Sequence, residues 1–164
     1  MLKFTKMEGI GNDYIYIDGI HQDVPMNPHF ITKISDRHFG IGSDGVIVIQ
    51  ESEICDFKMR MFNLDGSEGK MCGNGIRCFA KFVYDHQLTK KTYLEIETLG
   101  GIKKVWLIID NNKVQYVRVN MGQPILKSKE IPCLFDKEEM INEPIEVDGQ
   151  VYYLTSLSMG NPHT

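Results

Sequence analysis

Apolar and polar residues follow one another along the chain in short runs that predict strands. Leu2–Lys6 and Tyr14–Asp18 carry aromatic and β-branched residues and are bounded by Gly, Asn or Asp. Val46–Gln50 is a compact Val/Ile run, and Cys55–Phe62 alternates apolar with polar residues, which is typical of a half-buried strand. Further strands are predicted at Thr92–Thr98, Lys103–Asp110, Val114–Asn120, Pro144–Val147 and Val151–Ser158.

Two segments have helical spacing instead. Pro28–His38 places apolar residues on one helical face and stops near Gly40. In Gly75–His86 the apolar residues cover most of the helical wheel, so this helix is expected to be deeply buried. Together the elements predict an α+β fold, in which a mainly antiparallel sheet wraps around one central buried helix.

The composition changes after Met121–Pro124, where Lys, Glu and Pro become frequent. We therefore expect one domain at residues 1–119 and a linker with further structure at residues 120–164. A segment of roughly forty residues is small for an independent domain, which normally needs about twice that length. The second segment is expected to be the start of an incomplete second domain.

Composition and charge limit the classes of function. The 164 residues are 42% hydrophobic and 24% charged, which is enough for a folded core. Eighteen basic and 22 acidic residues give a net charge of −4 without a basic block, unlike a nucleic-acid-binding protein. No apolar run approaches the ~18–20 residues that span a membrane, and no secretory signal is evident. We expect a cytoplasmic protein that binds a small molecule, not nucleic acid or a membrane.

The four cysteines do not form a metal or disulfide pattern. They are too few and too irregularly spaced for a disulfide framework, and no C-x-x-C pair suggests zinc. Gly40–Gly45 matches the letters G-x-G-x-x-G, but it follows a helix and precedes a strand. A dinucleotide site needs the opposite order, so we interpret this segment as a structural turn.

Cys72 stands directly before the predicted buried helix, in Met71-Cys72-Gly73-Asn74-Gly75. A helix N-terminus offers free backbone N–H groups and the positive end of the helix dipole, which favour a thiolate. Gly73 and Gly75 leave these N–H groups accessible to an anion such as a carboxylate. The same residues would also serve as a simple turn into a core helix, and the segment alone does not separate the two interpretations.

Three Gly-rich turns add polar groups at strand ends. They are Gly9–Asp13, Phe62–Gly66 and Ser158–His163, and each carries an amide or an imidazole. Turns held on a rigid scaffold are places where polar side chains converge on a ligand.

Taken in order, these segments resemble the N-terminal half of diaminopimelate epimerases. The resemblance covers essentially the whole chain and is most specific around Cys72. Its segments are Lys6–Tyr14, Arg37–Gly45, Phe62–Asn63 with Asp65–Glu68, Met71–Cys78 and Met159–His163. It implies a cofactor-independent enzyme without a metal that converts LL-diaminopimelate to the meso form for lysine and peptidoglycan-precursor synthesis.

The resemblance also implies roles for individual residues. Cys72 would be one of two acid/base groups, and His163 would lie near the thiol pair and tune its protonation. Gly73 and Asn74 would donate hydrogen bonds to the substrate carboxylate. The polar ends of the substrate would be bound by Asn12, Asn63 and Asn161. The second cysteine would come from a missing C-terminal half, because Cys133 is not followed by glycine or a buried helix. The family resemblance further implies a homodimer.

Two alternatives remain open at this point. Cys72 with His163 as a base would also suit a cysteine hydrolase or transferase, although no local hydrolase signature is present. In the second alternative, the isolated chain is a non-catalytic fragment that binds an amino acid or a complementary protein segment.

Overall fold

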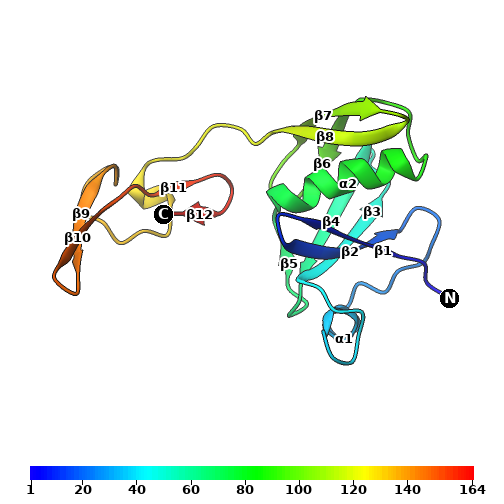
Figure 1. Cartoon of the computed structure of the whole chain (residues 1–164), viewed down its shortest axis with the longest axis horizontal. Helices are drawn as coiled ribbons and strands as arrows, with labels where there is room; N and C mark the ends of the chain where they lie inside the picture. Colours follow the sequence, from blue (N-terminus) through cyan, green and yellow to red (C-terminus); the bar gives the residue numbers. More distant parts are fainter. The chain divides into compact units, whose positions relative to one another are not determined.

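A curled sheet encloses a central helix in the first part of the computed structural model, which describes residues 1–164 (Figure 1). Contacts divide the chain into two compact units, Met1–Asn120 and Met121–Thr164. The elements of the first unit are β1 (Thr5–Gly9), β2 (Asn12–Asp18), α1 (Pro28–Ser35), β3 (Gly45–Gln50), β4 (Phe57–Asn63), β5 (Glu68–Gly69), α2 (Gly73–Asp85), β6 (Tyr93–Glu97), β7 (Lys103–Asp110) and β8 (Lys113–Asn120).

The sheet has the strand order β1-β2-β3-β4-β6-β7-β8, with β5 paired to β4. The pairs β2–β3 and β4–β6 are parallel and the other five are antiparallel. Helix α2 contacts β1 and β2 near one edge and β7 and β8 at the other, so the sheet must curl around it. The predicted α+β class, with a mainly antiparallel sheet around a buried helix, is confirmed.

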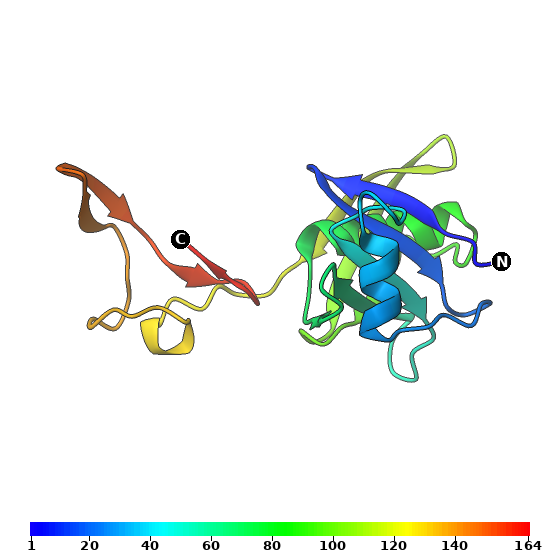
Figure 2. The same cartoon turned by 90° about the horizontal axis from the view of Figure 1, so that it is seen from below.

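The apolar wheel of α2 explains why the sheet closes on it. Its buried residues are Gly75, Ile76, Cys78, Phe79, Ala80, Phe82 and Val83, and they join one core with the inner face of the sheet. A second core lies on the outer face of the sheet, where α1 packs against β3 (Figure 2). Strands β2 and β3 are therefore buried on both faces, which accounts for their continuous Ile and Val runs.

Some predicted boundaries were wrong. Strand β1 begins at Thr5 and not at Leu2, because the hairpin turn lies further on, at Ile10 and Gly11, with φ of 57° and 79°. Helix α1 ends at Ser35, three residues before the predicted end. The carboxylate of Asp36 accepts hydrogen bonds from the backbone N–H groups of the next turn, which stops the helix.

The second unit contains only short elements. They are a 3₁₀ turn (Ser128–Glu130), β9 (Glu143–Val147), β10 (Gln150–Leu154), β11 (Leu157–Ser158) and β12 (Pro162–His163). The predicted turn at Asp148–Gly149 joins β9 and β10, and both of its residues have positive φ. The predicted strand Val151–Ser158 is interrupted between β10 and β11. No helix of the chain is long and apolar enough to cross a membrane.

Candidate active site

Cys72 caps the N-terminus of α2. Its backbone is extended, with φ −134° and ψ 117°, and its sulfur accepts a hydrogen bond of 3.2 Å from the backbone N–H of Gly75. The half-buried sulfur thus occupies the position that a Ser or Asp oxygen takes in an ordinary N-cap. A Cβ on Gly75 would lie 2.7 Å from Ile47 Cδ1, so glycine permits the close packing of the helix start on β3. A negative charge on the sulfur would be stabilised by this N–H group and the helix dipole.

The hairpin β1–β2 brings Asn12 to Cys72, although 60 residues separate them. The thiol donates to Asn12 Oδ1 at 3.3 Å. The amide nitrogen of Asn12 donates to Asp44 Oδ2 at 2.8 Å. Cys72 therefore has a hydrogen-bond donor on one side, from Gly75, and an acceptor on the other, from Asn12. This is the first pair of predicted site residues that the fold brings together.

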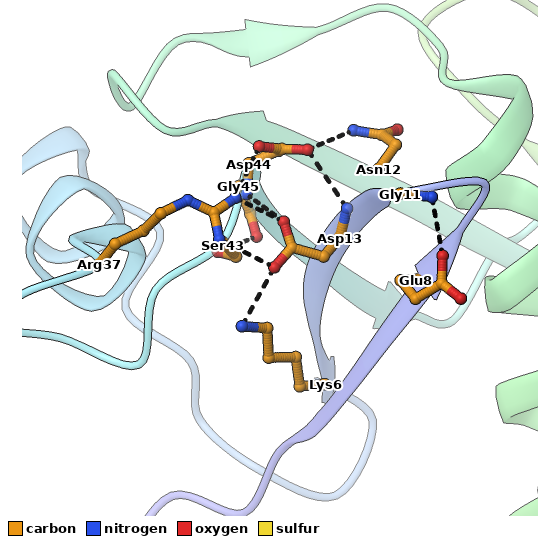
Figure 3. A network of polar contacts seen from close by, with 9 residues as sticks. All are labelled: Lys6, Glu8, Gly11, Asn12, Asp13, Arg37, Ser43, Asp44 and Gly45. Carbon is orange, nitrogen blue, oxygen red and sulfur yellow. Dashed lines mark hydrogen bonds and ion pairs between the residues drawn. The ribbon is translucent and has the colours of Figure 1, made fainter.

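Charged residues behind Asn12 form a connected network (Figure 3). The guanidinium of Arg37 bonds to both Asp13 oxygens, at 2.7 and 3.2 Å, and to Asp44 Oδ1 at 2.9 Å. Lys6 lies 3.1 Å from Asp13 on the side away from Asp44. Hydrogen bonding to Arg37, and to a lesser degree to Lys6, lowers the pKa of Asp13 from 3.8 to about 2. The network ties β1 and β2 to the loop that precedes β3.

The lowered pKa of Asp13 predicts acid-dependent stability. Because the folded-state pKa lies below the unfolded value, the contribution is present above about pH 4 and lost as the pH falls toward 2. We expect Asp13→Asn to lower the free energy of unfolding by about 1 kcal/mol at pH 7, a value reduced for screening because Arg37 is half-exposed. Urea unfolding of both proteins at pH 7, 4 and 2 measures this difference. The difference should fall to a small fraction of its pH 7 value at pH 2, and a difference that is constant with pH would contradict the assignment.

Tyr14 is a further neighbour of the thiol that the sequence analysis missed. Its side chain is buried on the inner face of β2, and burial, followed by the nearby Cys72, raises its pKa. The phenol therefore stays protonated and neutral. The hydroxyl of Tyr16, two residues on, donates to the carbonyl of Gly75 at 3.0 Å and holds the first turn of α2 against the sheet.

Gly73 and Asn74 are the first two residues of α2, which begins two residues before the predicted start at Gly75. Arg77 pairs with both residues: Nη1 donates to the backbone oxygen of Gly73 at 3.0 Å, and Nη2 donates to the side-chain Oδ1 of Asn74. The backbone N–H groups at the start of a helix have no partner within the helix, so they are suited to bind an anion. Donation to a substrate carboxylate remains a prediction.

Asn63 lies at the end of β4, in register with Gly45 on β3, which is itself in register with Tyr14 on β2. Its amide nitrogen donates to Ser67 Oγ at 3.0 Å. A Cβ on Gly45 would lie 2.0 Å from Phe62 O and 2.9 Å from the Tyr14 ring. Position 45, which lies between Tyr14 and Asn63 on the neighbouring strands, therefore requires glycine. This agrees with a structural role for the Gly40–Gly45 turn.

Asn161 and His163 belong to the second unit. The imidazole Nε2 of His163 lies 3.0 Å from Asn161 Oδ1, within the β11–β12 turn region. Their approach to Cys72 remains a prediction. Cys78 is buried in α2, whereas Cys55 lies in the bend before β4 and is only half-buried. No group of three or more His, Cys, Asp or Glu side chains is arranged to hold a metal ion.

Solved structures with this fold are racemases and epimerases, among others. A probable proline racemase from Agrobacterium radiobacter K84 superposes with a TM-score of 0.68 at 10% identity, covering 96% of this chain and 49% of that chain. A hydroxyproline epimerase from Agrobacterium vitis gives a TM-score of 0.63 at 11% identity, covering 94% of this chain and 48% of that chain. These similarities show the fold.

The sequence identifies the family. The diaminopimelate epimerase family profile matches residues 4–127. The diaminopimelate epimerase of Methanococcus maripaludis S2 is 57% identical over 163 residues, and that of Acetivibrio thermocellus is 52% identical over 162 residues. Each match covers 99% of this chain and 58% of the relative, so the chain spans little more than half the length of these curated relatives. The chain belongs to the diaminopimelate epimerase family.

Proposed function

We propose that this chain is the part of a diaminopimelate epimerase that supplies one of its two acid/base groups, Cys72. The observation that carries the proposal is the position of the sulfur between the Gly75 N–H and Asn12 Oδ1. The N–H group stabilises a thiolate, and the amide oxygen stabilises a thiol. A residue that accepts a proton in one direction of the reaction and donates one in the other needs both states.

The chemistry of inversion explains the other residue types. Inverting an α-carbon removes its proton on one face and delivers a proton on the opposite face. Negative charge then develops toward the substrate carboxylate, where the N–H groups of Gly73 and Asn74 at the start of α2 would stabilise it. No bound cofactor takes part in these proposed steps. Asn12, Asn63 and Asn161 would bind the polar ends of the substrate, and His163 would tune the protonation of the thiol pair.

The second acid/base group is proposed to be a cysteine in a part of the protein beyond this chain, since the matched relatives are longer. Residues 120–164 would then begin the second domain. The reaction would belong to lysine and peptidoglycan-precursor synthesis, which we place in the cytoplasm. We expect the complete enzyme to be a homodimer.

The test is incubation with LL-diaminopimelate in D₂O, with α-deuterium followed by NMR and stereochemistry by chiral chromatography. Two proteins are compared: this chain, and an extended protein in which the chain is followed by the uncovered part of the Methanococcus maripaludis relative. We expect exchange and meso product from the extended protein only. Meso product from the chain alone would show that both acid/base groups lie within it, and no product from either would contradict the proposed function.

Two further measurements distinguish the alternatives. A non-catalytic binding fragment would bind diaminopimelate in calorimetry without supporting exchange when extended. A cysteine hydrolase would form a covalent acyl adduct on Cys72, detectable by mass. The imidazole of His163 pairs with Asn161 within its own unit.

A further inference from the structure

The amide of Asn12 lies between a carboxylate and a thiol. Its nitrogen donates to Asp44 Oδ2 at 2.8 Å, and its oxygen accepts from Cys72 at 3.3 Å. An amide has one donor end and one acceptor end, so a partner that fixes one end also fixes the other. An ionised carboxylate only accepts hydrogen bonds, and therefore binds the NH₂ end of the amide.

The Asp44 carboxylate is itself held in place from two sides. Oδ2 also accepts from the backbone N–H of Asp13 at 3.2 Å, and Oδ1 accepts from Arg37 at 2.9 Å. Arg37 is anchored in turn by its two bonds to Asp13 (Figure 3). A carboxylate with both oxygens occupied by donors keeps its orientation.

We propose that Asp44 is a positioning residue, which fixes the orientation of the Asn12 amide and thereby keeps a hydrogen-bond acceptor on the Cys72 thiol. Its importance for catalysis rests on the proposed function, since an epimerase needs the thiol state as well as the thiolate. Were the amide reversed, its NH₂ group would face the sulfur, which already accepts from Gly75. Two donors would then favour the thiolate and leave less of the protonated Cys72 that the reaction needs as a proton donor.

The other titratable groups around the sulfur add no charge beside it. Tyr14 and Tyr16 on β2 and Cys78 on α2 face the same region, and burial raises the pKa of each. All three are therefore neutral near pH 7. Arg77 on α2 donates to the backbone oxygen of Gly73 and to the side-chain oxygen of Asn74.

The first test measures the rate of alkylation of Cys72 by iodoacetamide against pH, with peptide mass spectrometry to separate the four cysteines. The full chain is used. In Asp44→Asn the partner can accept or donate, so the Asn12 amide is free to reverse. We expect the midpoint of the Cys72 profile to fall by about half a unit to one unit. An unchanged midpoint would overturn the proposal.

Loss of a negative charge near Cys72 would shift the midpoint in the same direction, so a second comparison separates charge from orientation. In an Asn12→Ala background there is no amide to orient, and Asp44→Asn should cause a much smaller further shift. Asp13→Asn removes the same charge from a residue that holds Asp44 only indirectly, through Arg37, and should also shift the midpoint less. If Asp44→Asn shifted the midpoint equally in the unsubstituted chain and in the Asn12→Ala background, the effect would come from the lost charge alone, and the proposal would be overturned.

Arg37→Lys provides a test that does not depend on the folding of Asp44→Asn. It keeps the net charge but loses the forked contact that holds Asp44. We expect a downward shift of the midpoint that is smaller than in Asp44→Asn. If charge alone mattered, the midpoint would not move, so an unchanged midpoint in Arg37→Lys would contradict the proposal. Because alkylation reports the thiol directly, its outcome is independent of the deuterium-exchange test of the proposed function.

Discussion

Cys72→Ser should lower α-deuterium exchange in the extended protein by roughly 10²–10⁴-fold. A serine hydroxyl can still accept the hydrogen bond from Gly75, so the N-cap of α2 and the fold are preserved. It holds its proton much more tightly than a thiol, so it cannot act as a base near neutral pH. The measurement is the initial rate of deuterium incorporation into LL-diaminopimelate, with urea unfolding to verify that stability is unchanged.

Cys55→Ser is the matched control for this substitution. Cys55 is also half-buried, but it lies in the bend before β4 and contacts neither Asn12 nor the start of α2. The exchange rate of this variant should equal that of the unsubstituted protein. If Cys72→Ser kept the full exchange rate, Cys72 would not be an acid/base group and the proposed function would need another proton carrier.

Elements with a strong periodic signal were predictable from the sequence. Strand β7 has the predicted bounds, since a turn dipeptide stands on each side of it. The buried helix α2 was evident because apolar residues cover its wheel, although its first two residues were missed and its end was predicted one residue too late. The end of α1 was not predictable from periodicity, because the Asp36 side chain and not the apolar pattern decides where the helix stops.

The pairing of the strands was harder to predict from the sequence than the strands themselves. The parallel pairs β2–β3 and β4–β6 depend on where α1 and α2 cross over, and an alternating pattern does not record strand direction. The position of Cys72 at a helix start followed from Gly-Asn-Gly before an apolar helical run. Its contact with Asn12 did not, because only the resemblance placed the two in one site.

The charged network behind Asn12 shows what local sequence cannot indicate. Arg37 reaches Asp13 across 24 positions, and Asn12 reaches Asp44 across 32. Both acidic residues lie in segments that the resemblance singled out, but no spacing rule connects them. The sequence therefore suggested which turns matter, whereas the fold determines which side chains meet.

Phe79→Ala should cause the largest loss of stability in the first unit. Phe79 is 0% exposed at the centre of α2 and lies edge to face with Phe57, with ring centroids 6.3 Å apart. Truncation removes this ring from the core around which the sheet curls, and leaves a cavity that neighbouring strands fill only in part. We expect the free energy of unfolding to fall by about 3–5 kcal/mol. Urea unfolding followed by circular dichroism measures the change.

Phe39→Ala separates burial from the mere loss of an aromatic ring. Phe39 is 93% exposed and contacts His38 on the surface, so its removal should change the free energy of unfolding by less than about 0.5 kcal/mol. A small effect of Phe79→Ala, comparable to that of Phe39→Ala, would mean that the sheet does not depend on α2 for its core. Because Cys72 is held at the start of the same helix, the catalytic proposal depends on this core: only a firmly packed α2 keeps the sulfur against Asn12.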